Sequence, residues 1–157
     1  PNINHETTLV LILRKTYKGV HSAQVGFPGG KLETGDASLK EAAIRETFEE
    51  VGVPINTIEI IKTLSYVYIP PSHFYVQPFL GVTKKTPQFI KQDDEVEAII
   101  EVPLNHLLDE KIVRKKIVST SYSIDVEVPA FKLSGHIVWG ATAMMLSEIK
   151  DLLKQLR

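Results

Sequence analysis

The sequence contains no cysteine among its 157 residues, which excludes disulfide bonds and zinc sites built on thiolates. It has no apolar run approaching the roughly 18–20 residues of a membrane-spanning helix, and no signal peptide is visible. Its formal net charge of −1 gives no overall attraction to nucleic acid or to an anionic membrane. The lack of cysteine does not fix the compartment, but with no signal peptide and no membrane span we expect a cytoplasmic protein that has neither a nucleic-acid partner nor a membrane partner.

The remaining composition is that of an ordinary globular domain. Apolar residues make up 43% and charged residues 24%, so we expect a single domain over residues 1–157 with a sizeable core. Strand-like and helix-like stretches alternate along the chain, which predicts an α+β fold, an α/β sandwich. The expected elements are strands at 8–13, 58–69 and 73–82, a hairpin of 112–118 with 122–128, and a long helix at 141–155. A homodimer is among the assemblies that the sequence leaves open.

A glycine turn followed by an acid-rich helix is the most informative stretch. Gly29–Gly30 forms the turn, and Ser38 with Glu41 has the spacing of a capping box that begins the helix, with Asp36 as an alternative N-cap. Gly52 stands where a left-handed residue would end the helix. The stretch therefore predicts one helix with a defined start and a defined end.

On a helical wheel this helix has two different faces. The apolar face, predicted to pack on the core, holds Ile44, Phe48 and Val51. The other face holds Arg45, Glu46, Glu49 and Glu50. Clustered carboxylates suit Mg²⁺ or Mn²⁺, whereas the simpler alternative is a solvated helix surface. We expect the three glutamates and the Gly30 carbonyl to bind metal, and Arg45 to hold Glu49 or a neighbouring acid in place.

This stretch resembles the Nudix box of the Nudix hydrolases, in which a glycine, an acid and an Arg-Glu-x-x-Glu-Glu-x-Gly segment follow one another. Gly30, Asp36 and residues 45–52 carry the resemblance. Asp36 stands where the general pattern has glutamate, eight rather than seven residues separate it from Arg45, and Thr47 replaces an apolar residue. The resemblance implies a hydrolase with Glu49, Glu50 and Arg45 among its catalytic residues.

The aspartate and the extra residue are similar to the coenzyme A diphosphatase branch of that family. Further segments similar to this branch are residues 21–30, 68–74, 76–79 and 139–143. Gly26 departs from the branch, which more often has serine there. The resemblance implies the Nudix fold, a mixed β-sheet flanked by helices, from about residue 9 onward, with the usual N-terminal strand short or missing. It also implies cleavage of coenzyme A or an acyl-CoA into adenosine 3′,5′-bisphosphate and 4′-phosphopantetheine.

Several residues outside the box complete the expected site. Glu95 lies where Nudix enzymes often place a general base or a further metal ligand, and Glu97, two residues along the strand, is the alternative. Arg14 and Lys15 are expected to reach substrate phosphates by charge attraction, with an ordinary solvated loop as the alternative. The other substrate-binding candidates are Phe27, Lys31 and His73.

Three other functions are compatible with the same residues. A Nudix enzyme acting on ADP-ribose, NADH or a dNTP would share the box, and its partner would again be a small nucleoside diphosphate derivative. A non-catalytic Nudix domain would only sense a nucleotide. An interaction module would use the apolar face of the helix expected at 141–155. The complete set of acids in the box favours an enzyme over a sensing domain, and absence of metal binding would favour the interaction module.

Overall fold

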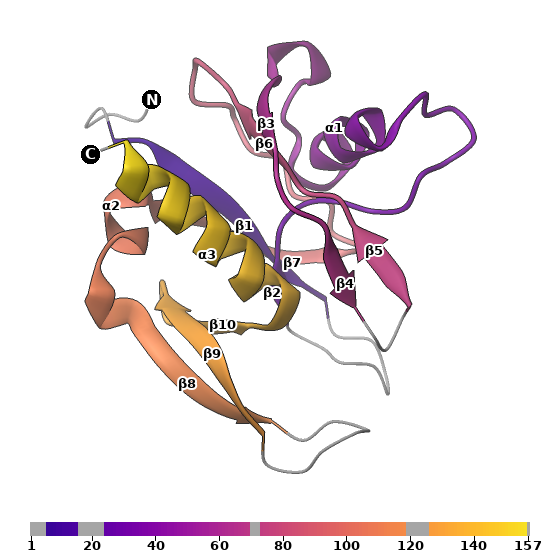
Figure 1. The fold of residues 1–157 in the computed structure, drawn as a ribbon. Helices are drawn as coiled ribbons and strands as arrows, with labels where there is room; N and C mark the ends of the chain where they lie inside the picture. The colour runs from indigo at the N-terminus through magenta and orange to yellow at the C-terminus, as the bar shows by residue number, and fades with distance from the viewer. Residues whose placement is uncertain (1–5, 16–23, 70–72, 119–125, 157) are drawn as a thin grey trace.

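The computed structural model describes residues 6–15, 24–69, 73–118 and 126–156. The chain forms an α+β arrangement in which a short central sheet has other elements on both of its faces (Figure 1). The turn expected at residues 70–72 and part of the basic loop after Lys15 lie outside the described residues.

The central sheet is built on strand β1 (Thr8–Arg14), which pairs antiparallel with β7 (Val96–Pro103) and with the short β2 (Val25–Gly26). Successive side chains of a strand point to opposite faces of its sheet. Leu11 and Ile12 are both fully buried, and each belongs to a different apolar cluster. The continuous apolar run predicted as a buried strand is therefore confirmed, and it is buried on both faces.

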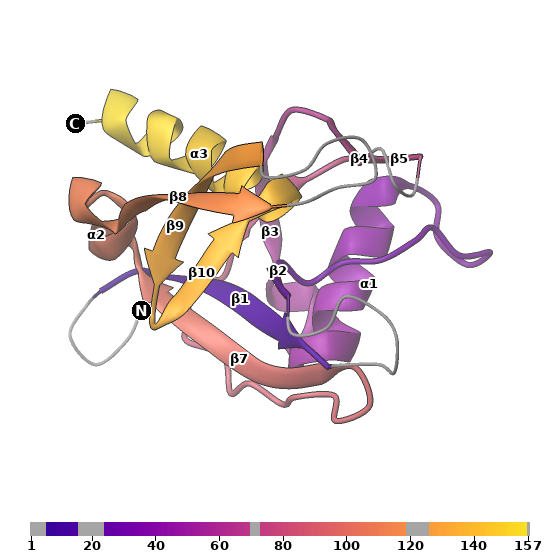
Figure 2. The same cartoon turned by 90° about the horizontal axis from the view of Figure 1, so that it is seen from below.

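One face of the central sheet is covered by the C-terminal part of the chain. A three-stranded antiparallel sheet has the order β10 (His136–Trp139), β9 (Val126–Leu133), β8 (Val113–Val118), and helix α3 (Gly140–Gln155) packs with it, as Figure 2 shows from below. The expected long helix is confirmed. The expected hairpin is present as β8 paired with β9, but its second strand runs over Val126–Leu133 instead of 122–128, and residues 122–125 lie outside the described residues. No helix among the described residues is both long and apolar enough to cross a membrane.

Helix α1 covers the other face through Val51, whereas the strands that follow it in the chain also belong to the first apolar cluster, through Leu80. The elements here are α1 (Leu39–Val51), β3 (Glu59–Thr63), β4 (Val67–Ile69), β5 (Phe74–Val76) and β6 (Phe79–Val82). The remaining short helices are η1 (Ile55–Thr57), α2 (Leu104–Leu107) and η2 (Glu110–Ile112). The expected strand at 73–82 is split into β5 and β6 around Pro78, which has no N–H to donate to a ladder.

The predicted α+β class is confirmed. In place of one continuous mixed sheet, the described strands form four small sheets whose recorded pairs are all antiparallel. Helix α1, which carries the acid-rich segment, packs on the central sheet through the cluster shared by Val51 and Ile12.

Both ends of α1 are those that the sequence predicts. The Ser38 hydroxyl accepts a hydrogen bond from the Glu41 N–H at 3.2 Å, and the Glu41 carboxylate accepts one from the Ala37 N–H at 2.6 Å. Gly52 has a φ of 79°, and its N–H donates to the Phe48 carbonyl. A left-handed residue is least costly as glycine. The Ser38 cap and the C-terminal glycine are therefore confirmed, whereas the Glu41 carboxylate reaches the N–H of Ala37, one residue before the cap, and not that of Ser38 as a capping box requires.

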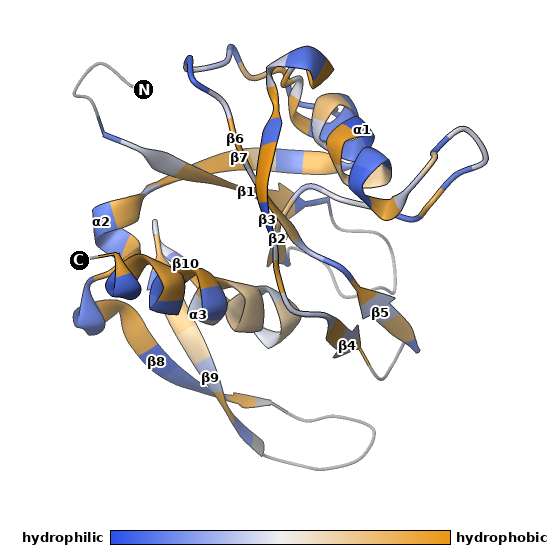
Figure 3. Cartoon of the chain, turned by 45° about the horizontal axis from the view of Figure 1, so that its top comes forward, coloured by the Kyte–Doolittle hydropathy of each residue, from blue (hydrophilic) through white to orange (hydrophobic). Residues whose placement is uncertain are grey.

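The rotation of α1 about its axis differs from the prediction. Phe48 was expected on the core, but 47% of it is exposed. The buried residues of the helix are Ala42, Glu50 and Val51, and hydrophilic residues run along its length (Figure 3). The helix is turned so that the small side chains of Ala43 and Thr47 face inward together with Glu50, which leaves Phe48 at the edge of the packed face.

Replacing Ser38 with alanine is expected to destabilise the protein by about 1 kcal/mol, the usual cost of losing an N-cap side chain. For a chain of this length that corresponds to a fall in Tm of about 2–4 °C. Thermal unfolding followed by circular dichroism measures the effect. Ser38→Thr keeps a hydroxyl at the cap and serves as the matched control, and an equal loss in both variants would contradict the capping role.

Candidate metal centre and active site

Three carboxylates converge beside the central sheet. Glu46 and Glu50 come from α1 and Glu95 from the residue before β7, and one oxygen from each lies within 4.8 Å of the others. The Glu50 side chain is 1% exposed and that of Glu46 13%, whereas Glu95 is exposed. The group is thus anchored in the protein on one side and open to solvent on the other.

Glu95 reaches this group because its chain segment is hydrogen-bonded to the end of α1. The last carbonyls of a helix have no partner within the helix. Here the Gln92 N–H donates to the Glu50 carbonyl at 3.1 Å, and the Ile90 N–H donates to the Val51 carbonyl at 2.8 Å. The Glu95 N–H then donates to the Gln92 carbonyl at 3.3 Å. The same backbone contacts therefore finish the helix and position the third acid.

Glu50 is held from two directions. Its Oε1 accepts a hydrogen bond from the Gly29 N–H at 2.8 Å, and its Oε2 accepts one from Arg14 Nη1 at 3.1 Å. Burial raises the pKa of the Glu50 carboxyl above its ordinary value. The Gly29 N–H and Arg14 oppose this rise in pKa, whereas Glu46 and Glu95 add to it. A divalent cation between the carboxylates would offset the energetic cost of burying the Glu50 charge and would reduce its repulsion with Glu46 and Glu95.

Arg45 connects the acid face of α1 to the loop before it. Its Nε and Nη2 donate to the two oxygens of Asp36, each at 2.9 Å, and Nη2 also donates to the Lys31 carbonyl at 3.2 Å. Its Nη1 donates to Glu46 at 2.8 Å and to Glu49 at 3.1 Å. The hydrogen bonds from Arg45 are the main reason that the pKa of Asp36 is lowered. Arg45 thus contacts Glu49, as expected, and orients Glu46 as well.

Gly30 lies directly against one of the three carboxylates. A methyl group added to its Cα would come within 2.7 Å of the Glu46 carboxylate, closer than real contacts allow. Only a residue without a side chain lets the loop backbone run this close. The structure therefore accounts for a glycine at position 30, and the role of its carbonyl as a metal ligand stays a prediction.

The two remaining acids proposed for the site lie outside the group of three. Glu49 is 44% exposed, and its carboxylate pairs with Arg45. Glu97 is exposed on β7. The register of β1 and β7 shifts between Leu13 and Arg14, which pair with Ala98 and Val96, so Glu97 has no partner position on β1. The rule that residues two apart point to the same face of a strand therefore does not carry over from Glu95 to Glu97. Among the alternatives left open by the sequence, the geometry brings Glu95 and not Glu97 to the site.

The predicted substrate-binding residues divide into two places. Arg14 turns inward, donating to Glu50 and, from Nη2, to the Phe27 carbonyl at 3.1 Å. The Lys15 N–H donates to the Glu95 carbonyl at 3.0 Å, so this residue borders the acid group through its backbone. These contacts place positions 14, 15 and 27 at the edge of the three carboxylates.

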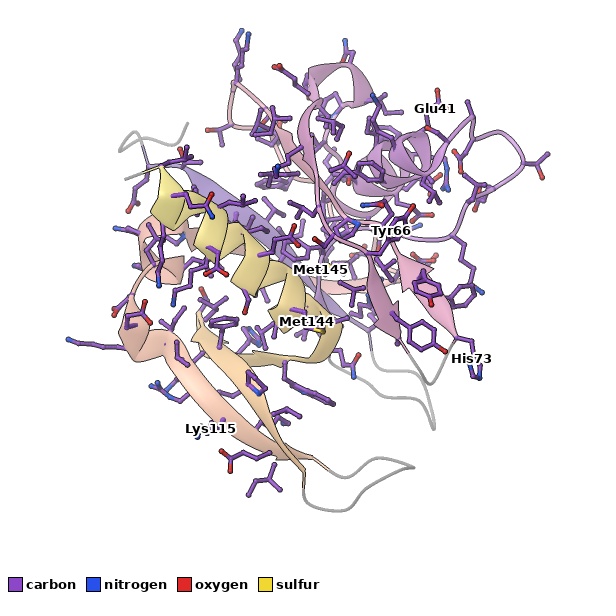
Figure 4. The ribbon with its side chains drawn as sticks, in the orientation of Figure 1. Glu41, Tyr66, His73, Lys115, Met144 and Met145 are labelled. Carbon is purple, nitrogen blue, oxygen red and sulfur yellow. The ribbon has the colours of Figure 1, made fainter. Side chains whose placement is uncertain are left out.

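Lys31 and His73 are associated with the hairpin of β4 and β5. The Lys31 ammonium lies 4.7 Å from the centre of the Phe74 ring. The Tyr68 hydroxyl and His73 Nδ1 are 3.1 Å apart, and His73 points away from α1 at the outer end of the hairpin (Figure 4). Sequence reasoning did not anticipate the contact of Phe74 with Lys31 or the backbone role of Gln92. A backbone contact such as that of Gln92 has no side-chain signature by which it could have been found.

Comparison with known proteins places the chain in a family. A model described as NUDIX domain matches residues 2–120. Relatives in Yersinia pestis (strain Pestoides F) and Yersinia pseudotuberculosis (serotype O:1b, strain IP 31758), both described as uncharacterized Nudix hydrolase NudL, are 28% identical over 151 residues. Each alignment covers 92% of this chain and 71% of the relative.

A solved structure supports the same fold. The MutT/nudix family protein from Enterococcus faecalis superposes with a TM-score of 0.50 at 15% sequence identity. The match covers 94% of this chain and 55% of the other, so this chain spans just over half the length of that protein. Because the family model covers most of the chain, and because the relatives it matches are described as Nudix hydrolases, this protein belongs to the NUDIX domain family and is a Nudix hydrolase.

Proposed function

We propose that this hydrolase cleaves the diphosphate of coenzyme A or an acyl-CoA, giving adenosine 3′,5′-bisphosphate and 4′-phosphopantetheine, in a reaction that depends on Mg²⁺ or Mn²⁺. The observation that carries the hydrolytic part is the convergence of Glu46, Glu50 and Glu95 within 4.8 Å. The similarity of residues 21–30 and 68–74 to the coenzyme A diphosphatase branch supports the substrate.

The residues present fit a hard divalent cation. All three side chains offer carboxylate oxygens, the donors that Mg²⁺ and Mn²⁺ prefer. Glu50 is buried, so water solvates its negative charge poorly and a bound cation would stabilise that charge. Glu95 is exposed, which leaves an approach for the substrate. We propose Glu46 and Glu50 as ligands, with Glu49 and the Gly30 carbonyl as further candidates, and Glu95 as either an extra ligand or the general base.

The chain's own residues can then assist the reaction. A bound dication would neutralise phosphate charge and acidify a water molecule. We propose that Glu95, because it is the exposed member of the group, accepts the proton of the attacking water when it acts as general base. The water oxygen forms the new bond to phosphorus, and the bridging oxygen leaves with the other phosphate. Arg45 keeps Glu46 in position through its 2.8 Å hydrogen bond.

A cavity adjoins the glycine loop next to the acid group, and we propose that it receives the nucleotide and the extended arm of the substrate. Its volume is about 1120 Å³, and its walls include residues 29–31 of the glycine loop, Leu39 and Ala43 of α1, and Phe74 and Tyr75 of the hairpin. Most of the lining is apolar, as is usual for small-molecule sites. The Lys31 ammonium, held over Phe74 next to the glycine loop, is placed to meet a substrate phosphate.

The proposal predicts a specific order of substrates. With Mn²⁺ or Mg²⁺, kcat/KM for coenzyme A should exceed those for ADP-ribose, NADH and dNTPs by about tenfold or more, the size of one well-placed group contact. Separation of the products by chromatography measures the rates and identifies the bond cut. Chelation of the metal with EDTA should abolish turnover, and added Mn²⁺ should restore it.

Two results would count against the proposal. A preference for ADP-ribose, NADH or a dNTP would show that the proposed substrate is wrong, while the proposed hydrolysis of a diphosphate would still hold. Binding of a nucleotide without any turnover in the presence of metal would indicate a sensing domain.

The cytoplasmic location and a homodimer stay predictions. Gel filtration with light scattering measures the oligomeric state.

A further inference from the structure

Arg14 is the last residue of β1, and strand alternation determines which way it points. Side chains two residues apart lie on the same face of a strand. Ile12 belongs to the same apolar cluster as Val51 of α1. Arg14, two residues further along β1, meets the same helix at Glu50, the residue next to Val51. From its charge alone, Arg14 was expected to face the substrate. The geometry of β1 instead directs its side chain to α1.

The guanidinium of Arg14 links three separate segments. Nη1 donates to Glu50 Oε2 at 3.1 Å, and Nη2 donates to the Phe27 carbonyl at 3.1 Å. These contacts tie β1 to α1 and to the chain just before Gly29. The planar, multiply donating head of arginine can make both contacts at once, whereas a lysine ammonium is a single point charge on a flexible stem.

The burial of Glu50 makes this contact energetically important. A carboxylate that is 1% exposed is strongly destabilising unless it is paired and hydrogen-bonded. Among the described residues, Arg14 is the only one that forms a salt bridge with Glu50. Removing one partner of a buried pair leaves the other charge uncompensated. The Arg14 side chain is 41% exposed, so solvent can reach it more easily than it reaches Glu50.

We infer that Arg14 is a positioning residue that holds the Glu50 carboxylate toward the metal centre and balances its charge when no dication is bound. It acts through Glu50 and not by binding a substrate phosphate. The effect on stability is independent of the proposed function, whereas the effect on turnover rests on it.

A double-mutant cycle in the presence of EDTA tests the first part. Arg14→Met is expected to lower Tm by about 5 °C or more, because a buried pair is broken. In the Glu50→Gln background the same change should lower Tm by less than about 2 °C, because no buried charge is left to balance. Lys15→Met is the matched control: it removes the neighbouring cation and keeps the backbone N–H that contacts Glu95, so its effect on Tm should be equal in both backgrounds.

Additive effects of Arg14→Met and Glu50→Gln on Tm would overturn the inference. If Arg14→Met does not fold, recovery of folding in the double variant supports the coupling. If the double variant also fails, the same cycle with Arg14→Lys decides, since lysine keeps the charge and can make only one of the two contacts.

Steady-state kinetics on coenzyme A with saturating Mn²⁺ tests the second part. A positioning role predicts that kcat for Arg14→Met falls by about tenfold or more while KM changes by less than about twofold. Arg14→Lys should recover part of kcat. A rise in KM with kcat unchanged would instead show that Arg14 binds substrate. Absence of turnover in the wild-type protein would overturn the proposed function and leave the stability coupling between Arg14 and Glu50 to be judged on its own result.

Discussion

Glu50→Gln is expected to reduce turnover by more than about 100-fold while the protein stays folded. Loss of a group that merely orients a ligand already costs about 10–100-fold, and Glu50 is the buried member of the acid group itself. The amide keeps an oxygen that can accept from the Gly29 N–H, and it removes a buried charge, so folding should survive. Turnover of coenzyme A and Mn²⁺ binding by calorimetry measure the two losses together.

The control for Glu50→Gln is Glu59→Gln. Glu59 is an exposed acid on β3, and its replacement removes one negative charge without changing the acid group. It should retain normal turnover and normal Mn²⁺ affinity. Near-normal activity in Glu50→Gln would mean that the metal is held elsewhere, and the hydrolytic role of the three carboxylates would have to be abandoned.

Gly30→Ala is expected to reduce turnover by about 10–100-fold, the loss typical of disturbing the support of a metal ligand. The added methyl would lie 2.7 Å from the Glu46 carboxylate, so that carboxylate must move out of the group and away from Arg45. A side-chain end can swing aside, so the loss of stability should be small compared with the loss of turnover. Kinetics and thermal unfolding of the same sample separate the two.

Gly29→Ala is the matched comparison for Gly30→Ala. Its new methyl meets nothing within 4 Å among the described residues, and its N–H to Glu50 is kept. It should therefore lose much less activity than Gly30→Ala. Equal losses in the two variants would show that the loop needs glycine for its flexibility and not for the close approach to Glu46.

The limits of α1 could be predicted because its signals are local. Ser38 and Glu41 are three residues apart, and Gly52 follows the helix directly, so their interactions depend on nearby backbone alone. The rotation of the helix could not be predicted in the same way. Ala43 and Thr47 are small, so a helical wheel gives them little weight and places the buried face around Phe48. In the structure the buried face instead includes Glu50.

The acid group was predicted in part for a similar reason. The spacing of Glu46 and Glu50 along one helix places them together, whereas the positions of Arg14 and Glu95 depend on how β1 and β7 meet that helix. The resemblance to the Nudix hydrolases, outside the box itself, supplied Glu95 as a candidate. The register shift opposite Arg14, which separates Glu95 from Glu97, has no signature in the sequence that we can name.

The hydrogen bonds from Ile90 and Gln92 to the end of α1 bear on any attempt to transplant this catalytic motif. A peptide or graft copying residues 29–52 would carry Glu46 and Glu50 into a new scaffold. It would leave behind the segment that delivers Glu95 and the strand that presents Arg14, so one acid would be missing and another would lose its cation. Copying the sequence of the motif would therefore not reproduce the site. A successful graft would have to include β1 and the segment before β7 that carries Glu95.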